Sequence, residues 1–185
     1  MPPIFLIAGA PATGKSTASR ALAVRFLKSI VIGVDDLRNM VIGGVVHPSA
    51  AWGDELVAQL QLARTSALLM ARTYHAAGYA VVIDDFYDPY TQMHEYDELV
   101  ANEKLMRILL YPNRQKAHAQ NLQRSGPGQL QEYLDEGIEI VYAALDKAAG
   151  QLAQDGWTVL DTTHDTVEAT AARLARLAHQ VEGEL

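Results

Sequence analysis

One eight-residue segment near the start of the chain limits the fold more than any other feature. Residues 9–16 read Gly-Ala-Pro-Ala-Thr-Gly-Lys-Ser, directly after the apolar run Ile4–Ala8 and before a helix-forming stretch. They fit the pattern GxxxxGK followed by Ser or Thr, whose glycines let backbone N–H groups turn inward around a polyphosphate. The partial positive charge of the next helix faces the same anion. The pattern therefore predicts a strand, a phosphate-binding loop and a helix, in that order.

The loop predicts a nucleotide site that uses ATP and Mg²⁺. We expect Lys15 to reach the outer phosphates and the Ser16 hydroxyl to bind the Mg²⁺. The predicted nucleotide-binding residues are Arg124, from a later basic segment, and the loop residues Gly9, Ala10, Pro11, Ala12, Thr13, Gly14, Lys15, Ser16 and Thr17.

The composition favours one globular domain over residues 1–185. The chain is 49% hydrophobic and 20% charged, which provides enough apolar content for a full core. No apolar run approaches the roughly 18 residues that span a membrane, and the chain starts with a strand, so we expect a cytoplasmic protein without a membrane partner. The absence of cysteine excludes disulfides and thiolate metal sites. The net charge of −7 argues against a large nucleic-acid surface.

Short apolar runs alternate with helical periodicity along the chain. The runs predict five buried parallel strands at Ile4–Ala8, Ile30–Val34, Ala80–Ile83, Leu105–Leu110 and Trp157–Leu160. The predicted helices cover about 15–28 and 54–77, and two more start near 132 and at Asp165, which we expect to cap the last one. This alternation predicts a doubly wound α/β sheet.

Two segments do not fit the alternation, and in such folds the loops at the carboxyl ends of the strands build the site. Residues of about 40–53 contain His47 and Trp52, and we interpret this segment as a substrate-side loop. Residues of about 112–128 are polar and basic and end in Gly126-Pro127-Gly128, and we interpret them as a helical lid.

The second predicted strand ends in charged residues. Asp35, just past the strand, is a candidate general base for an acceptor hydroxyl, and Arg38, one turn further, is a candidate clamp for an anionic part of a substrate. We expect Asp36 to cap the following helix.

The third predicted strand ends in Asp84-Asp85, carboxylates that suit Mg²⁺ or a substrate beside the phosphate loop. Side chains alternate along a strand, so only one of the two faces the site, and we favour Asp85. We expect Asp88 to be a turn residue.

Two arginines of the lid segment lie ten residues apart. At about 100° per residue, Arg114 and Arg124 are separated by about 80° around a helix, so both can lean over one ligand. An arginine delivered by a lid stabilises the charge of a phosphoryl group in transfer, and we favour Arg124 for this role.

The remaining candidates are weaker. The segment Asp161-Thr162-Thr163 fits either a helix cap or an edge of an adenine pocket. The six histidines show no metal-ligand spacing, and His47 is the one expected near a pocket. Trp52, Tyr87 and Tyr90 fit either stacking on a substrate ring or packing.

Taken together, these motifs resemble the small P-loop kinases, a group that includes gluconate and shikimate kinases, chloramphenicol phosphotransferase, zeta-toxin-like kinases and the kinase domain of phage-type polynucleotide 5′-kinase. The resemblance covers the whole chain. It implies a three-layer α/β/α fold of the nucleotide and shikimate kinase type, with a five-stranded parallel sheet in the order 2-3-1-4-5. It also implies Mg²⁺-dependent transfer from ATP to a hydroxyl. The polynucleotide kinase pattern falls on Lys15, Ser16, Asp35, Arg38, Asp85 and Arg124.

The chain departs from this group at two places. Lids of the group often carry two arginines about four residues apart, whereas the earlier position here is Gln120, so a charge is missing or is supplied by Arg114. The segment Gly43-Gly44-Val45-Val46 matches no substrate loop of the group.

The leading hypothesis is a kinase that moves the γ-phosphoryl group of ATP to the hydroxyl of a small molecule, with Lys15, Asp35 and Arg124 as catalytic residues. The substrate would be bound by Asp35, Arg38 and Asp85, and the metal by Ser16 and Asp85. The alternative is a polynucleotide 5′-hydroxyl kinase, which fits the motif spacing but not the acidity. A nucleotide-dependent switch or ATPase is a second alternative, which the Asp35 and Arg38 pattern disfavours.

Overall fold

Five parallel strands form the central sheet of the computed structural model, which describes residues 1–46, 53–89, 93–103 and 105–183. The strands are β1 (Ile4–Ala8), β2 (Ser29–Gly33), β3 (Ala80–Asp84), β4 (Met106–Leu110) and β5 (Thr158–Leu160). They lie in the order β2-β3-β1-β4-β5, and each neighbouring pair is parallel. The predicted sheet and its strand order are confirmed.

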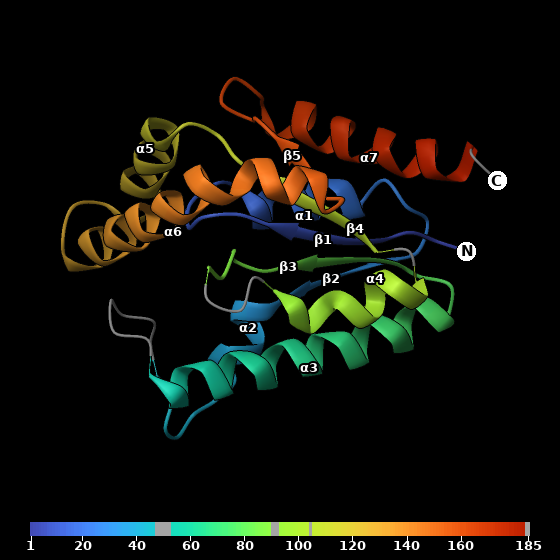
Figure 1. Cartoon of the computed structure of the whole chain (residues 1–185), viewed down its shortest axis with the longest axis horizontal. Coiled ribbons are helices and arrows are strands. Elements are labelled where there is room, and N and C mark those ends of the chain that lie inside the picture. The colour runs from blue at the N-terminus through green and yellow to red at the C-terminus, as the bar shows by residue number, and fades with distance from the viewer. Residues whose placement is uncertain (47–52, 90–92, 104, 184–185) are drawn as a thin grey trace.

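Helices connect the strands and cover both faces of the sheet (Figure 1). They are α1 (Lys15–Ala23), α2 (Val34–Asn39), α3 (Asp54–Ala76), a 3-10 turn (His94–Tyr96), α4 (Asp97–Glu103), α5 (Arg114–Ser125), α6 (Gln129–Gln154) and α7 (Val167–Gly183). Within the described ranges, none of these helices is both long and apolar enough to cross a membrane.

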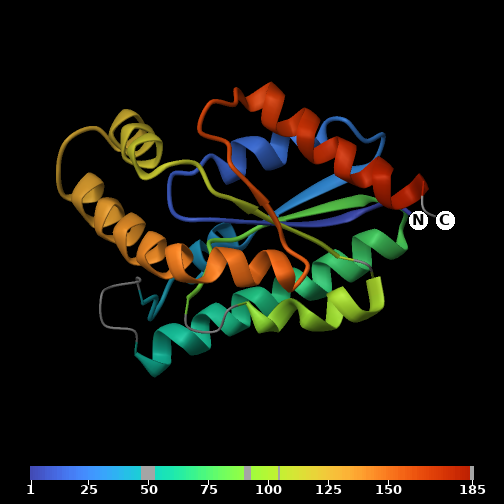
Figure 2. The same cartoon turned by 45° about the horizontal axis from the view of Figure 1, so that its top comes forward.

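Two apolar clusters hold these helices on opposite faces of the sheet (Figure 2). On one face, α1 and α7 pack against strand residues such as Ile7 and Val82. On the other face, α3, α4 and α6 pack against residues such as Leu6 and Ile83. Successive strand residues point to opposite faces, so the central strand β1 is buried over its whole length. The predicted three-layer architecture is confirmed.

Several element boundaries differ from the sequence predictions. Helix α1 ends at Ala23 and does not continue to about residue 28. Strand β2 ends at Gly33, and Val34 already belongs to α2, a short helix that apolar periodicity does not reveal. The 3-10 turn and α4 were not predicted either. At the start of α7, the hydroxyl of Thr166 accepts the Ala169 N–H at 3.1 Å, so Thr166, not Asp165, caps this helix.

The start of α2 also corrects the role expected for Asp36. Gly33 is the N-cap, and no side chain there makes a capping hydrogen bond. Asp35 and Asp36 both lie in the first turn, where the partial positive charge of the helix end favours carboxylates. The helix therefore starts at the sheet edge with two acidic side chains close to the phosphate loop.

Candidate active site

The phosphate-binding loop folds tightly at the carboxyl end of β1. Gly9 has a φ of 157°, and a Cβ there would lie 2.6 Å from the Leu110 carbonyl oxygen at the end of β4. Gly14 is the N-cap of α1 and has a φ of 86°. Residues with a side chain rarely adopt this left-handed conformation. The Thr13 hydroxyl donates to the Ala10 carbonyl at 2.9 Å. The two glycines thus allow a turn that leads directly into the N-terminus of α1.

Lys15 is the first residue of α1 and lies under this loop. Its Nζ donates to the Ala10 carbonyl at 2.8 Å, so its side chain folds back along the loop. Burial lowers the pKa of Lys15, while the carboxylates of Asp84 and Asp35 raise it. A polyphosphate at this position would add negative charge and favour the protonated amine.

Asp84, not Asp85, faces the loop, which corrects the sequence preference. Asp84 lies beside Lys15 and accepts a hydrogen bond from Ser16. Burial raises the pKa of Asp84, while Lys15 and the Ser16 hydrogen bond lower it. The physical reason is the alternation of the strand, which puts Asp84 on the same face as Val82 and α1 and turns Asp85 toward α3.

Asp85 belongs to a buried ion-pair network that sequence reasoning missed. The Arg64 Nε donates to Asp85 Oδ2 at 2.8 Å, and the Tyr96 hydroxyl donates to the same oxygen at 2.9 Å. Arg64 also pairs with Asp88 and Glu95, each at 3.0 Å, so Asp88 is a buried ion-pair partner and not merely a turn residue. The available signal was an arginine on the apolar face of the predicted helix 54–77.

The predicted site residues meet around a cavity of about 410 Å³ at the carboxyl edge of the sheet. Its walls come from the phosphate loop, α2, the end of β3, the end of α5 and the first half of α6. The predicted residues that line it are Pro11, Ala12, Lys15, Ser16, Asp35, Arg38 and Arg124. The volume lies within the range of small-molecule sites.

Asp35 and Arg38 form one pair on the α2 side of the cavity. The Arg38 Nη1 lies 3.6 Å from Asp35 Oδ1, and Nη2 donates to the Val46 carbonyl at 2.8 Å. The arginine side chain is buried, and among the described residues its Nε has no hydrogen-bond partner. The Asp35 side chain is 66% exposed, so its carboxylate is accessible from the cavity.

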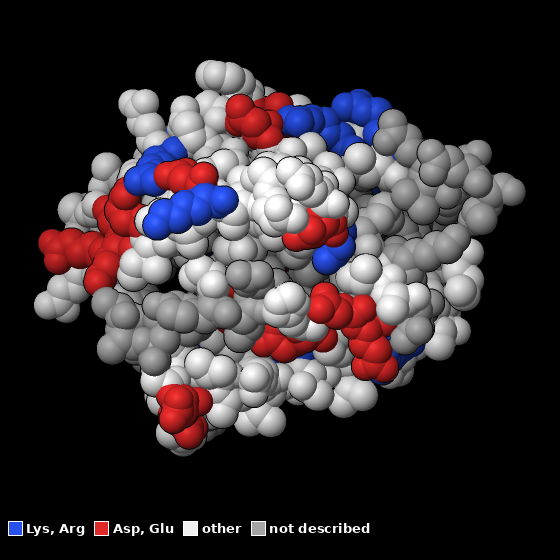
Figure 3. All heavy atoms as spheres, viewed as in Figure 1, with Lys and Arg blue, Asp and Glu red and all other residues white. Residues whose placement is uncertain are grey.

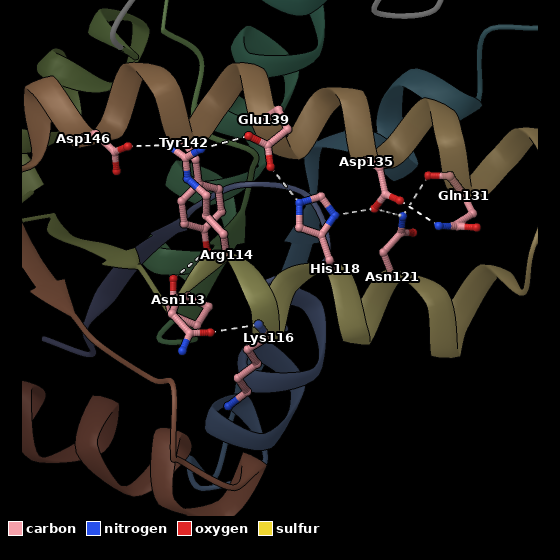
Figure 4. Close-up of polar contacts among 11 residues, drawn as sticks. Asn113, Arg114, Lys116, His118, Asn121, Gln131, Asp135, Glu139, Tyr142 and Asp146 are labelled. Atoms are coloured by element: carbon pink, nitrogen blue, oxygen red, sulfur yellow. Dashed lines mark hydrogen bonds and ion pairs between the residues drawn. The ribbon is translucent and has the colours of Figure 1, made fainter.

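The two arginines of the predicted lid point to different places. Arg124 lines the cavity. Arg114 pairs with Glu139 at 2.8 Å and with Asp146, and its guanidinium lies 5.6 Å from the centre of the Tyr142 ring (Figure 4). Arg114 therefore ties α5 to α6 and does not supply the second lid charge.

A second, smaller cavity of about 40 Å³ lies on the other side of the loop. Gln120, which lies close to Gly14, and Thr162 both line it. The segment considered for an adenine pocket thus contributes to this cavity. Lys116 holds the segment in place, because its Nζ donates to the carbonyls of Thr162 and Asp165.

The other candidates lie outside the cavity or outside the described residues. Tyr87 is buried in the core, which fits packing. His47, Trp52 and Tyr90 fall outside the described residues. Among the residues that the structure describes, no three His, Asp or Glu side chains form a metal-binding group.

Comparison with known proteins identifies the fold. Neither a protein-family model nor a curated protein matches this chain. A gluconokinase from Sinorhizobium meliloti 1021 is 18% identical with a TM-score of 0.65, over 99% of this chain and 97% of that one. A tunicamycin resistance protein from Deinococcus radiodurans is 20% identical with a TM-score of 0.64, over 96% and 95% of the two chains.

A shikimate kinase from Acinetobacter baumannii, solved in complex with shikimate, is 12% identical with a TM-score of 0.65, over 98% of this chain and 96% of that one. Each alignment covers nearly all of both chains, so the similarity includes the phosphate loop, the sheet and the helices on both faces. This chain has the fold of the small P-loop kinases.

Proposed function

We propose that this protein is an ATP-dependent kinase that transfers the γ-phosphoryl group to a hydroxyl of a small molecule. The observation that carries the proposal is one cavity that is lined by Lys15 and Asp84 at the phosphate loop and by the Asp35–Arg38 pair of α2. Similar structures include a gluconokinase and a shikimate kinase, which supports a phosphoryl transfer to a small acceptor.

Each charged residue has a role in this proposal. The loop amides and Lys15 bind the phosphates, and Arg124, on the segment proposed as a lid, stabilises the transferred group. Ser16 and Asp84 provide the oxygen ligands that suit Mg²⁺, which would neutralise phosphate charge when bound. Asp35 accepts the proton of the acceptor hydroxyl. Arg38, expected from the sequence to clamp an anionic part of the substrate, instead holds the Asp35 carboxylate in position in this proposal.

The two alternatives have less support. Binding of single-stranded nucleic acid needs a cationic track with aromatic side chains. On the face in Figure 3, the described acidic and basic side chains are interspersed and form no continuous basic band. Three carboxylates line the α2 and α6 sides of the cavity, at Asp35, Asp36 and Glu136, and would repel a nucleic-acid backbone.

A switch or ATPase without an acceptor would not require the Asp35–Arg38 pair.

The test is ADP formation from ATP and Mg²⁺ with pools of sugars, antibiotics, nucleosides and a 5′-hydroxyl oligonucleotide. We expect one small-molecule pool to stimulate ADP formation. Asp35→Asn should lower that turnover about a hundredfold or more while ATP binding changes little, because only the proton acceptor is lost. Asp54→Asn, a change in the first turn of α3, is the control. Equal losses of turnover and ATP binding in Asp35→Asn would contradict the role of a base.

A further inference from the structure

We infer that the phosphoryl acceptor is a bulky, largely apolar alcohol that is neutral or positively charged, and not an anionic sugar acid. The inference rests on the proposed function, because it concerns the acceptor half of the same cavity. It comes from the residues of α2, α6 and the β3 end that remain after the phosphate-binding groups are assigned.

The wall of the acceptor half is apolar. Leu130, Leu134 and Ile140 of α6 line the cavity together with Tyr133, and Phe86 lies on the β3 side. These α6 positions recur at helical spacing, so they form one stripe along the helix. Leu130 is 59% exposed and Tyr133 is 39% exposed, although both line a concave site. An exposed apolar wall of a cavity is typical of a site that binds an apolar ligand.

Packing against α5 does not account for this stripe. The residues of α6 that contact α5 are Asp135, Glu139, Tyr142 and Asp146 through their side chains and Gln131 through its backbone carbonyl, which accepts from Asn121 (Figure 4). At about 100° per residue they lie on the side of α6 opposite the stripe. Among the described residues, none of these hydrogen bonds, ion pairs or cation–π contacts between α5 and α6 involves the apolar stripe, whose residues line the cavity.

The charges near the wall disfavour an anion. Lys15 and Arg124 are assigned to the nucleotide phosphates, which leaves Arg38 as the cation of the acceptor half. Its guanidinium already contacts the Asp35 carboxylate and the Val46 carbonyl. Glu136 lines the same half, and no other cation is found there among the described residues. A bound carboxylate would face like charges, which costs affinity, whereas an amine would be attracted.

Tyr133 lies at the point where the apolar wall and these charges meet. Burial raises the pKa of Tyr133, Asp35 and Glu136 raise it further, and Arg38 opposes them. The aromatic side chain of α6 therefore lies within electrostatic reach of the α2 pair. An acceptor with a ring or alkyl body against this wall would present its hydroxyl to Asp35.

Phosphoryl transfer to this acceptor involves ATP, the alcohol and the Asp35 carboxylate. The acceptor oxygen attacks the γ-phosphorus of ATP, its proton passes to the Asp35 carboxylate, and the bond from the γ-phosphorus to the bridging oxygen breaks. The products are ADP and a phosphate monoester of the alcohol. No redox partner is needed.

The experiment compares three primary alcohols that share a phenyl group and differ in charge: phenylalaninol carries an ammonium, hydrocinnamyl alcohol is neutral and tropate carries a carboxylate. Shikimate and gluconate are added as anionic sugar acids. Binding to the whole protein with a non-hydrolysable ATP analogue and Mg²⁺ is measured by ligand-observed NMR, and phosphorylation with ATP by mass spectrometry. We expect phenylalaninol and hydrocinnamyl alcohol to bind at least about tenfold more tightly than tropate.

Two variants connect this preference to the cavity. Glu136→Gln should reduce the preference for phenylalaninol over tropate, and Tyr133→Ala should weaken all three phenyl alcohols. Glu132→Gln is the matched control, an exposed acid of α6 outside the cavity lining. Tighter binding of tropate, phosphorylation of shikimate or gluconate in preference to the phenyl alcohols, or no binding of the amine and neutral alcohols at millimolar concentration would overturn the inference.

The two proposals can fail separately. Phosphorylation of a sugar acid would overturn the acceptor class and leave the kinase standing. Lack of ADP formation with every acceptor would overturn the kinase, while the NMR binding order would still decide which ligands the cavity prefers.

Discussion

Two adjacent aspartates at the end of β3 have different surroundings and therefore different expected roles. Asp84 lies near Lys15 and Ser16 at the phosphate loop. A cation bound there would offset the unfavourable burial of the Asp84 charge. Asp85 is buried, and its Oδ2 accepts from Arg64 and Tyr96; burial raises the pKa of Asp85 to about 6, while these two partners lower it. The first carboxylate is available to a ligand, and the second holds the strand end against α3.

Exchange of each aspartate for asparagine should separate these roles. Asp85→Asn leaves Arg64 without its nearest carboxylate, and we expect the free energy of unfolding to fall by about 3–5 kcal/mol. Asp84→Asn should affect stability much less, lower turnover and raise the Mg²⁺ concentration needed for half-maximal activity, because the metal loses one oxygen ligand. Urea unfolding and a Mg²⁺ titration of ADP formation measure the two effects. The opposite pattern, in which Asp85→Asn is as stable as the unchanged chain and needs more Mg²⁺, would contradict the assignment.

At the scale of elements, α5 presents two faces to two partners. Arg114 and His118 are four residues apart and contact α6 (Figure 4). Lys116, Gln120 and Arg124 follow one another at the same spacing and line the two cavities beside the phosphate loop. At about 100° per residue, the centres of these stripes lie roughly 140° apart. The angle explains why Arg114 cannot replace Gln120 as a lid charge.

The two arginines of α5 should respond differently to truncation. Arg124→Ala should lower turnover about a hundredfold with little loss of stability, because it removes a group that stabilises the transferred phosphoryl charge. Arg114→Ala should lower the unfolding free energy modestly and leave turnover nearly unchanged, because its partners lie on α6. Steady-state kinetics and urea unfolding of both variants provide the check. A larger kinetic loss in Arg114→Ala than in Arg124→Ala would refute this view of α5.

The contact of α5 with α6 should also depend on pH. Hydrogen bonds to Glu139 and Asp135 raise the pKa of His118 above its ordinary value of about 6.5. Protonated His118 is therefore favoured by folding, so its stabilisation is complete below about pH 6.5 and is lost as the pH rises through the raised pKa. Hydrogen bonds from Asn121 and His118 lower the pKa of Asp135, so its stabilisation is lost in acid.

The measurement is urea unfolding of the unchanged chain and of His118→Gln over a range of pH. The difference in unfolding free energy should be largest at mildly acidic pH and should shrink as the pH rises above about 6.5. A difference that is constant over this range would show that the charge of His118 contributes nothing to the contact.

The whole molecule brings together segments that are far apart in sequence, and much of this was predictable. The loop motif predicts β1 and α1, and the alternation of strands and helices predicts the sheet. Because the carboxyl ends of parallel strands lie at the same edge of the sheet, the loop, Asp35 and Arg38 were expected to lie close together. All three line the same cavity. The confirmed strand order came from the resemblance to P-loop kinases and not from periodicity.

The remaining features depend on three-dimensional relations that a single sequence does not contain. Which of Asp84 and Asp85 faces the loop depends on which face of β3 lies against α1. The buried Arg64 network depends on the packing of α3, although an arginine on an apolar helix face was a usable signal. The partner of Arg114 depends on the position of α6, and the six residues of α2 are too few for a clear period.

The central claim is that the phosphates of ATP bind at the loop through Lys15. Calorimetric titration of the unchanged chain, Lys15→Ala and the surface control Lys147→Ala with ATP and Mg²⁺ tests it most directly. We predict one ATP site in the unchanged chain and in Lys147→Ala, with affinity lower by about tenfold or more in Lys15→Ala, since a charge-assisted hydrogen bond contributes about 1.5–3 kcal/mol. No ATP binding by the unchanged chain, or equal binding by Lys15→Ala, would contradict the account.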